Sequence, residues 1–297
     1  MFNRFVSPVI LLFSMAVTDS AIYAQPVEFG TTSFDVTCFE DETVSETFSP
    51  LEECKRRFRE CIFNKNYTHA MRVLDEEARV SKGLPLDPLI VAVNTLVTRA
   101  MLYDLQGKRS QAVKMLSEYE IPECNSIRLL PYYYSVMATI SLRNGDYDET
   151  VKIMAKKIDQ LSESLSKEPN NADKDVTKIN VYLANIGVCA YYRLLAKCIV
   201  TEGCIDDRSM ITDYQAVLIC LYCESKTVEK LADEDVGYLT NICRPLLEPM
   251  SKFFENKNSR PFRVIPKKVQ PASIKSGKTK EDECSIELGF LFDIVYE

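Results

Sequence analysis

Apolar residues recur along most of the chain at the three- and four-residue spacing of an amphipathic helix. Ser49-Pro50, a strong helix start, opens the first helix, and a break at 64–66 separates it from a second one. Apolar runs at 89–105 and 131–142 predict further helices, and the pattern continues to residue 255. Residues 49–255 therefore predict an all-α domain.

Two look-alike turns divide this domain into helical hairpins. One lies in 106–116 and contains Gly107, and the other lies in 144–154 and contains Gly145. Each turn follows an apolar helical run and opens a second one, because glycine after the last helical residue ends a helix. A fainter third copy, without glycine, lies at 65–74. These turns predict stacked helix-turn-helix units.

The two ends of the chain differ from this helical middle. Residues 25–48 are polar and acidic, which predicts an irregular arm with a short strand or extended stretch at 31–37. Residues 256–284 are rich in lysine, arginine and proline, which predicts a basic linker without regular structure. Residues 285–297 alternate apolar and polar positions, which predicts a strand that needs a partner.

Composition narrows the class of protein. The 297 residues are 46% apolar and 27% charged, as in soluble globular proteins. A net charge of −7 makes nucleic acid a poor partner for the chain as a whole. Glycine-rich phosphate loops are missing, so nothing indicates a nucleotide or other small-molecule substrate.

The chain has one histidine, His69, which excludes metal sites that need two histidines. Any nucleophile paired with histidine would have to use this residue, and its place early in a predicted helix favours a surface role. Cys220-Leu221-Tyr222-Cys223 has metal-ligand spacing, but it lies within a predicted helix and has no second pair. We expect no catalytic residue, no metal and no cofactor.

The chain has eleven cysteines, and their redox state depends on the cellular compartment in which the protein works. Many occupy apolar helix positions, which favours reduced, buried thiols over a disulfide framework. Residues 1–24 point the other way, because Arg4, an apolar run and Ala21-Ile22-Tyr23-Ala24 have the layout of a secretory signal. A cleaved signal and a hydrophobic segment of the fold both stay open.

The hairpin pattern resembles the tetratricopeptide repeat when Gly107 and Gly145 are placed on that family's turn glycine. The residues that then fall on the family's packing positions are Leu96, Ala100, Tyr103, Ala112 and Leu116 in one repeat, and Tyr134, Met137, Ala138, Tyr147, Thr150 and Met154 in the next. The chain departs from the family in its period, roughly 38 residues instead of about 34. It also has Arg57 and Arg99 at expected leucines and Ser141 at an expected tyrosine.

The order of elements also resembles the C-terminal part of subunit 12 of the trafficking protein particle (TRAPP) complex. The segment Leu130-Pro131-Tyr132-Tyr133-Tyr134 is part of that likeness. This resemblance implies a cytoplasmic adaptor of vesicle tethering between endoplasmic reticulum and Golgi, which contacts membranes through its complex.

A helical-hairpin solenoid presents a concave groove lined by the first helix of each repeat. The repeat geometry predicts that this groove carries Asn94, Asp104, Tyr132, Ser135 and Arg143. Tyrosine and arginine in a groove favour peptide recognition. Coverage of these side chains by neighbouring helices is the alternative. The expected function is a non-enzymatic scaffold for other protein subunits; the alternative is a secreted or periplasmic binding protein.

Overall fold

The computed structural model describes residues 33–34, 49–84, 86–120, 130–167, 176–201, 208–231, 238–255, 262–269, 272–276, 284–288 and 290–296. Within these ranges the chain is mostly helical, as the hydrophobic pattern predicts. The predicted signal segment at 1–24, and the acidic arm apart from Ser33–Phe34, lie outside the described residues.

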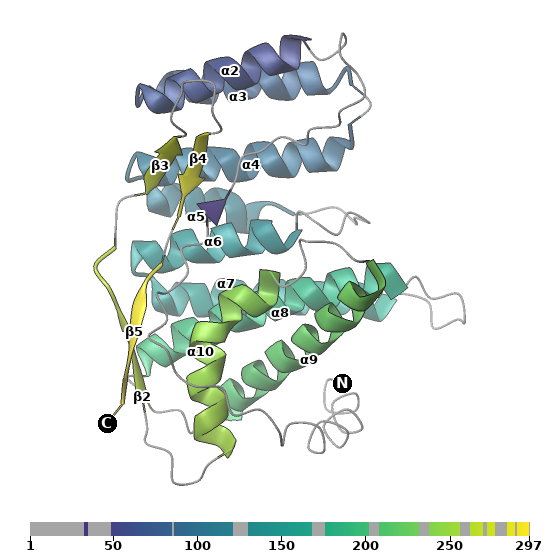
Figure 1. Cartoon of the computed structure of the whole chain (residues 1–297), viewed down its shortest axis with the longest axis vertical. Helices are drawn as coiled ribbons and strands as arrows, with labels where there is room; N and C mark the ends of the chain where they lie inside the picture. Colours follow the sequence, from purple (N-terminus) through teal and green to yellow (C-terminus); the bar gives the residue numbers. More distant parts are fainter. Residues whose placement is uncertain are drawn as a thin grey trace.

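The helices follow one another in a stack (Figure 1). Their bounds are α2 (Ser49–Phe63), α3 (Tyr67–Ser81), α4 (Pro88–Leu105), α5 (Arg109–Glu118), α6 (Leu130–Asn144), α7 (Tyr147–Lys167), α8 (Val176–Val200), α9 (Arg208–Leu231) and α10 (Tyr238–Glu255). From α2 to α9 each helix packs on the next in the chain. In addition, α4 contacts α6 and α6 contacts α8. The structure confirms a helical fold, while the tetratricopeptide assignment stays a prediction.

The helix starts follow from local chemistry. Asp87 caps α4, because its carboxylate accepts a hydrogen bond from the Leu89 backbone N–H at 2.8 Å. Pro88 occupies the first helical position, where its missing N–H costs nothing. Asn66 caps α3 in the same way and accepts from the His69 backbone N–H at 3.2 Å. His69 itself is an exposed residue of the first turn, as the sequence predicts.

Three helix ends share one backbone motif at the turns. One or two residues after the helix, the backbone takes a left-handed conformation, at Lys65 (φ 53°), Gly107 (φ 74°) and Gly145 (φ 84°). In the first two turns the N–H of the following residue reaches back across the turn, as in the Lys108 N–H to Tyr103 carbonyl bond of 2.8 Å. The faint third copy is therefore a real turn of the same kind, built on lysine.

Helix α8 is the centre of the core. It contacts α6, α7, α9, α10 and β2, and most of its side chains from Tyr182 onward are buried. By length and composition alone, α4 and α8 are apolar enough to cross a membrane. Packing against neighbours on several sides also requires a helix that is apolar all round, so these two helices are weak evidence for a membrane span.

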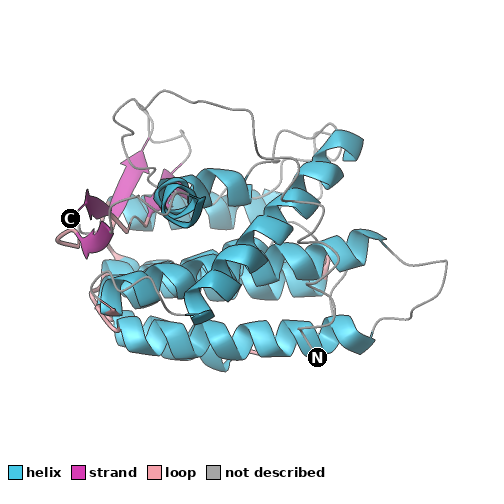
Figure 2. Ribbon diagram, turned by 90° about the horizontal axis from the view of Figure 1, so that it is seen from below, coloured by secondary structure: helices cyan, strands magenta, loops and turns pink. Residues whose placement is uncertain are grey.

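Two small antiparallel sheets correct the prediction for the C-terminal part. One has the order β1 (Ser33–Phe34), β4 (Cys284–Glu287), β3 (Ser273–Ser276), and the other pairs β2 (Phe262–Pro266) with β5 (Phe292–Tyr296). Figure 2 shows these strands gathered on one side of the helices. The linker predicted at 256–284 therefore holds two strands, and the single strand predicted at 285–297 is the end of β4 plus β5.

Substitution of alanine for Gly107 or Gly145 should destabilise the protein by about 1 kcal/mol each, because a Cβ is strained at positive φ. Space is not the reason, since an added Cβ would meet no atom within 4 Å at either site. Urea unfolding followed by circular dichroism measures the change. Gly83→Ala is the matched control: its φ is not positive, and its Cβ would make an ordinary 3.5 Å contact with the Val80 carbonyl. Equal losses at Gly83 and Gly107 would contradict this account.

Candidate protein-interaction surface

A buried ion cluster joins two of the predicted groove residues. Asp104 lies in the last turn of α4, and its carboxylate accepts from the Arg143 guanidinium of α6 at 2.9 and 3.2 Å. Arg109, at the start of α5, donates to the same carboxylate at 2.7 Å. Asp104 and Arg143 are each 2% exposed, whereas the Arg109 side chain is 25% exposed. One carboxylate thus holds three helices together.

This burial corrects the predicted peptide groove. Asp104, Ser135 and Arg143 are buried, so they are not available to a peptide. Tyr132 is half-buried and its hydroxyl lies 3.4 Å from the Met101 sulfur, while Asn94 is half-buried on α4. For Asp104 and Arg143 the prediction failed because the first helices α4 and α6 contact each other directly, and these two side chains pair across that contact. Ser135 is buried on the other side of α6, where it meets Tyr192 of α8.

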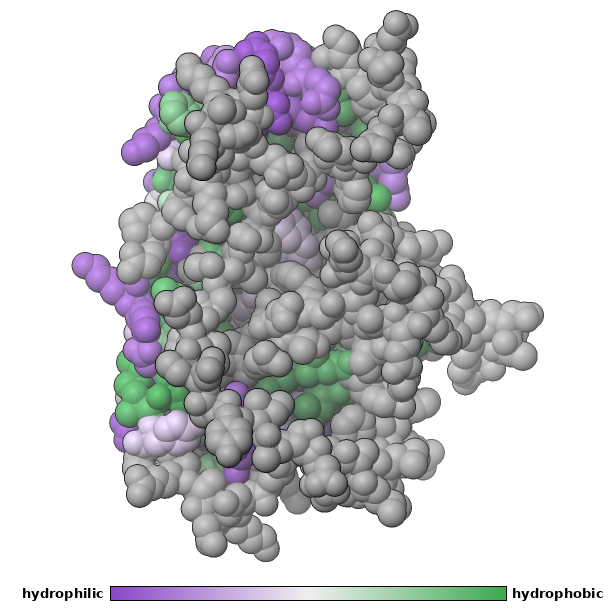
Figure 3. Space-filling view, viewed as in Figure 1, coloured by the Kyte–Doolittle hydropathy of each residue, from purple (hydrophilic) through white to green (hydrophobic). Residues whose placement is uncertain are grey.

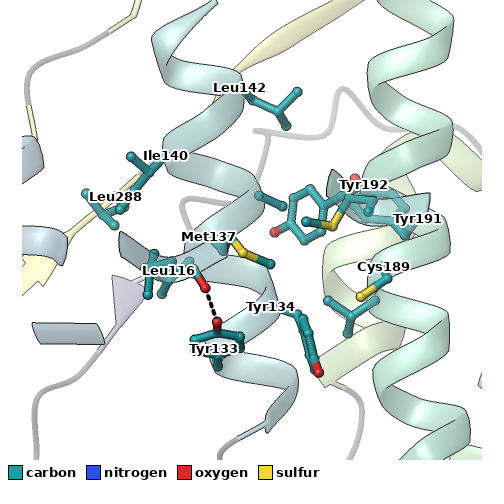
Figure 4. Packing of buried hydrophobic residues seen from close by; sticks show 14 of the residues in the cluster. Leu116, Tyr133, Tyr134, Met137, Ile140, Leu142, Cys189, Tyr191, Tyr192 and Leu288 are labelled. Atoms are coloured by element: carbon teal, nitrogen blue, oxygen red, sulfur yellow. Dashed lines mark hydrogen bonds between the residues drawn. The ribbon is translucent and has the colours of Figure 1, made fainter. Parts of the chain in front are cut away.

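The C-terminal segment packs on the helices beside these residues. Ile286 and Leu288 are buried, and Leu288 lies next to Ile140 of α6 (Figure 4). The ring of Phe290 meets that of Tyr147 at the start of α7, with centroids 6.4 Å apart. Strands β3 and β4 also contact α2. Part of the helical surface is therefore occupied by the chain itself.

Tyrosines fill the space between α5, α6 and α8. The fully buried Tyr133 hydroxyl donates to the Leu116 carbonyl, and its ring meets Tyr134 edge-on at 5.1 Å (Figure 4). Tyr191 and Tyr192 form the same edge-on pair in α8. Burial raises the pKa of all four hydroxyls, which stay neutral and serve as packing groups.

The carboxylates at 75–77 have structural partners. Glu76 pairs with Arg57 of α2 at 2.9 Å, and Asp75 pairs with Arg99 of α4. The two arginines that stand where the repeat family has leucine therefore tie α3 to the helices on both sides. These pairs are partly exposed, so each contributes little stability by itself.

Lys157 of α7 is a buried amine, a feature also found in catalytic lysines. Burial lowers its pKa, and its ammonium donates to the Tyr119 carbonyl at 3.2 Å. That bond ties α7 to the end of α5. The amine thus has a structural partner that accounts for its position.

Six described cysteines are buried thiols: Cys54, Cys61, Cys189, Cys198, Cys220 and Cys243. For these the prediction of burial is confirmed, and their reduced state stays a prediction. Burial raises the pKa of the Cys198 thiol to about 12, aided by nearby Asp213, and raises the pKa of Cys189 further. Cys220 lies in the middle of α9, far from the helix N-terminus that would activate a redox cysteine.

Metal-ligating side chains do not converge in the part of the chain that the structure describes, where no three His, Cys, Asp or Glu residues come together. The expectation of no metal and no cofactor stays a prediction for the chain as a whole.

A second buried carboxylate escaped the sequence analysis. Asp213 of α9 is fully buried, and Arg193 and Lys197 of α8 donate to it, the latter at 2.8 Å. The spacing of four residues between Arg193 and Lys197 places both cations on one face of α8. Two cations four residues apart in one apolar helix, followed by an acid in the next apolar helix, are the sequence signal that indicates this cluster.

Comparison of the sequence with protein-family models and with curated proteins, and of the structure with solved structures, finds no match. The described residues thus define a class by their architecture alone: a helical protein of successive antiparallel pairs, closed by C-terminal strands.

Asp104→Leu should destabilise the protein by about 3–5 kcal/mol, because it leaves the Arg143 guanidinium buried without its carboxylate. Arg109→Met should cost about 1 kcal/mol or less, since that side chain is partly exposed. Urea unfolding measures both. The double variant Asp104→Leu with Arg143→Met should recover most of the loss; a double variant as unstable as Asp104→Leu would contradict the buried-charge explanation.

Iodoacetamide at pH 8 should leave Cys198 of the native protein unmodified, because a pKa of about 12 leaves about one thiol in ten thousand ionised. The same cysteine should react fully after unfolding in urea. Peptide mass spectrometry after a timed quench compares the two samples. Equal rates of Cys198 alkylation in native and unfolded protein would show that the thiol is accessible.

Proposed function

We propose that the protein is a non-enzymatic scaffold that binds other proteins. The observation that carries the proposal is the series of antiparallel helix pairs α2–α3, α4–α5 and α6–α7, each joined by the same left-handed turn. Arrays of helical hairpins expose long continuous surfaces, and their usual role is to hold protein partners. The ion pairs and buried thiols described above have structural explanations, which also favours a scaffold over an enzyme.

The scaffold proposal predicts a stable complex in the native source. Affinity purification of the tagged full chain, followed by mass spectrometry, should recover the same protein subunits in fixed proportion. Size-exclusion chromatography of the extract should place the chain well above its own 33.9 kDa. Elution as a lone monomer would contradict the proposal. Enzymatic turnover lost on substitution of His69 or Cys220 would replace it by an enzyme.

The finer proposal is a cytoplasmic subunit of a vesicle-tethering complex at the endoplasmic reticulum and Golgi. Its support is the order of elements, which resembles subunit 12 of the TRAPP complex. Such a protein would meet membranes through its complex and would bind neither nucleic acid nor a small-molecule substrate. Purified complexes without other tethering subunits would remove this finer proposal and leave the scaffold in place.

The alternative is a secreted or periplasmic binding protein of the same fold. The apolar segment within residues 1–24 supports it, and the buried thiols at six described positions argue for a reducing compartment. Intact mass of the mature protein separates the two: loss of residues 1–24 supports export, and their retention supports the cytoplasmic proposal.

A further inference from the structure

The β2–β5 pair, here called the ribbon, has an inner face that belongs to the core. Phe262, Val264 and Phe292 are buried on this face. Phe262 meets Phe253 of α10 edge-on, with ring centroids 6.3 Å apart. Because side chains alternate along a strand, the residues between these positions point to the opposite, outer face.

The outer face follows from the register of the two strands. Arg263 lies opposite Val295 and Ile265 lies opposite Asp293. The pairing continues beyond β2, since the Lys267 N–H donates to the Leu291 carbonyl at 2.9 Å. Directly opposed residues of an antiparallel pair share one face, so these side chains form a single surface.

This outer face carries apolar and charged side chains side by side, with Val295 opposite Arg263 and Ile265 opposite Asp293. On this face Ile265 is 47% exposed and Val295 44% exposed, whereas Tyr296 lies opposite Phe262 and belongs to the inner face. Ile265 and Val295 are two of the six exposed large hydrophobic residues in the described part of the chain, and they lie on five-residue strands paired with each other. Figure 3 shows a green patch over the ribbon, beside a purple projection. Scattered exposed apolar residues are ordinary, but a cluster marks an interaction site.

The charges beside this patch are mostly positive. Arg263, Lys267 and Lys268 are exposed, and Asp293 is the carboxylate of the outer face, paired with Lys267 at 2.8 Å. The whole chain, in contrast, carries a net charge of −7. A partner that fits this surface has apolar side chains for the centre and carboxylates for the basic end.

We propose that the outer face of the ribbon binds an acidic segment of a partner protein, with apolar side chains against Ile265 and Val295 and carboxylates toward Lys267 and Lys268. The inference rests on the scaffold function and names the chemistry of one partner. An anionic membrane fits less well, because stable membrane binding needs a larger apolar area than Ile265 and Val295 expose.

Fluorescence anisotropy with the full chain tests the proposal. The probe is a short labelled peptide with valine pairs flanked by glutamates, and the comparison peptide has lysine for every glutamate. The glutamate peptide should bind saturably and more weakly at high salt. Ile265→Thr with Val295→Thr should raise its Kd by about tenfold or more. Threonine keeps the β-branch, so the strands stay intact.

Lys267→Gln with Lys268→Gln should also weaken binding and should reduce its dependence on salt. Val200→Thr is the matched control, since Val200 is 41% exposed at the end of α8, and it should leave the Kd unchanged. Three results would each overturn the proposal: no saturable binding, equal binding of the lysine peptide, or binding only to phosphatidylserine vesicles.

The two proposals fail separately. The ribbon site would be removed, and the scaffold kept, by two results together. Partners would co-purify equally with the wild type and with both ribbon variants, and the glutamate peptide would not bind. A chain that purifies alone removes the scaffold, whatever the peptide does.

Discussion

Asp104 places a negative charge in the protein interior. Side chains from two neighbouring helices pair with this charge, and the pairing constrains how the helices stack. A buried carboxylate is tolerated only when it is paired and hydrogen-bonded, so Arg143 and Arg109 must both approach it. That requirement fixes α6 against α4 and orients the start of α5. Asp213 does the same between α8 and α9, with Arg193 and Lys197. Apolar burial supplies most of the stability, while these two clusters select one arrangement of the helices.

The sequence predicted the helices well because local signals agreed with the packing. Pro88 after Asp87 marks a helix start, and Gly107 and Gly145 mark helix ends, and the structure uses each of them in that way. Lys65 shows the limit of such signals: the sequence predicted the break at 64–66, but lysine gives no sign of the left-handed conformation that it takes there. There the surrounding contacts, rather than the residue type, determine the turn.

The errors lie where distant segments meet. The alternation of Phe262, Arg263 and Val264 was present in the sequence, but the lysines and prolines around it favoured a linker. A strand this short is stable only with β5 and the core beneath it, and the sequence does not reveal that pairing. The predicted groove failed for a related reason. Asp104 and Arg143 were correctly placed on the first helices of neighbouring hairpins. Because their charges are opposite and the helices are adjacent, the two side chains pair with each other and do not line a binding site.

The C-terminal strands change which surface the proposed scaffold would offer a partner. Leu288 packs beside Ile140 and Phe290 against Tyr147, so apolar surface of α6 and α7 is covered within the chain. The ribbon that continues this segment has one buried face and one exposed face, on which Ile265 and Val295 lie among charged residues. A two-stranded ribbon has little stability of its own, so its inner face must stay on α10 and the core. Burial of the inner face holds the ribbon in place, so the outer face can remain exposed to solvent. Under the proposed function, the surface that partners would meet therefore includes the segment that closes the helical stack, in addition to the hairpins themselves.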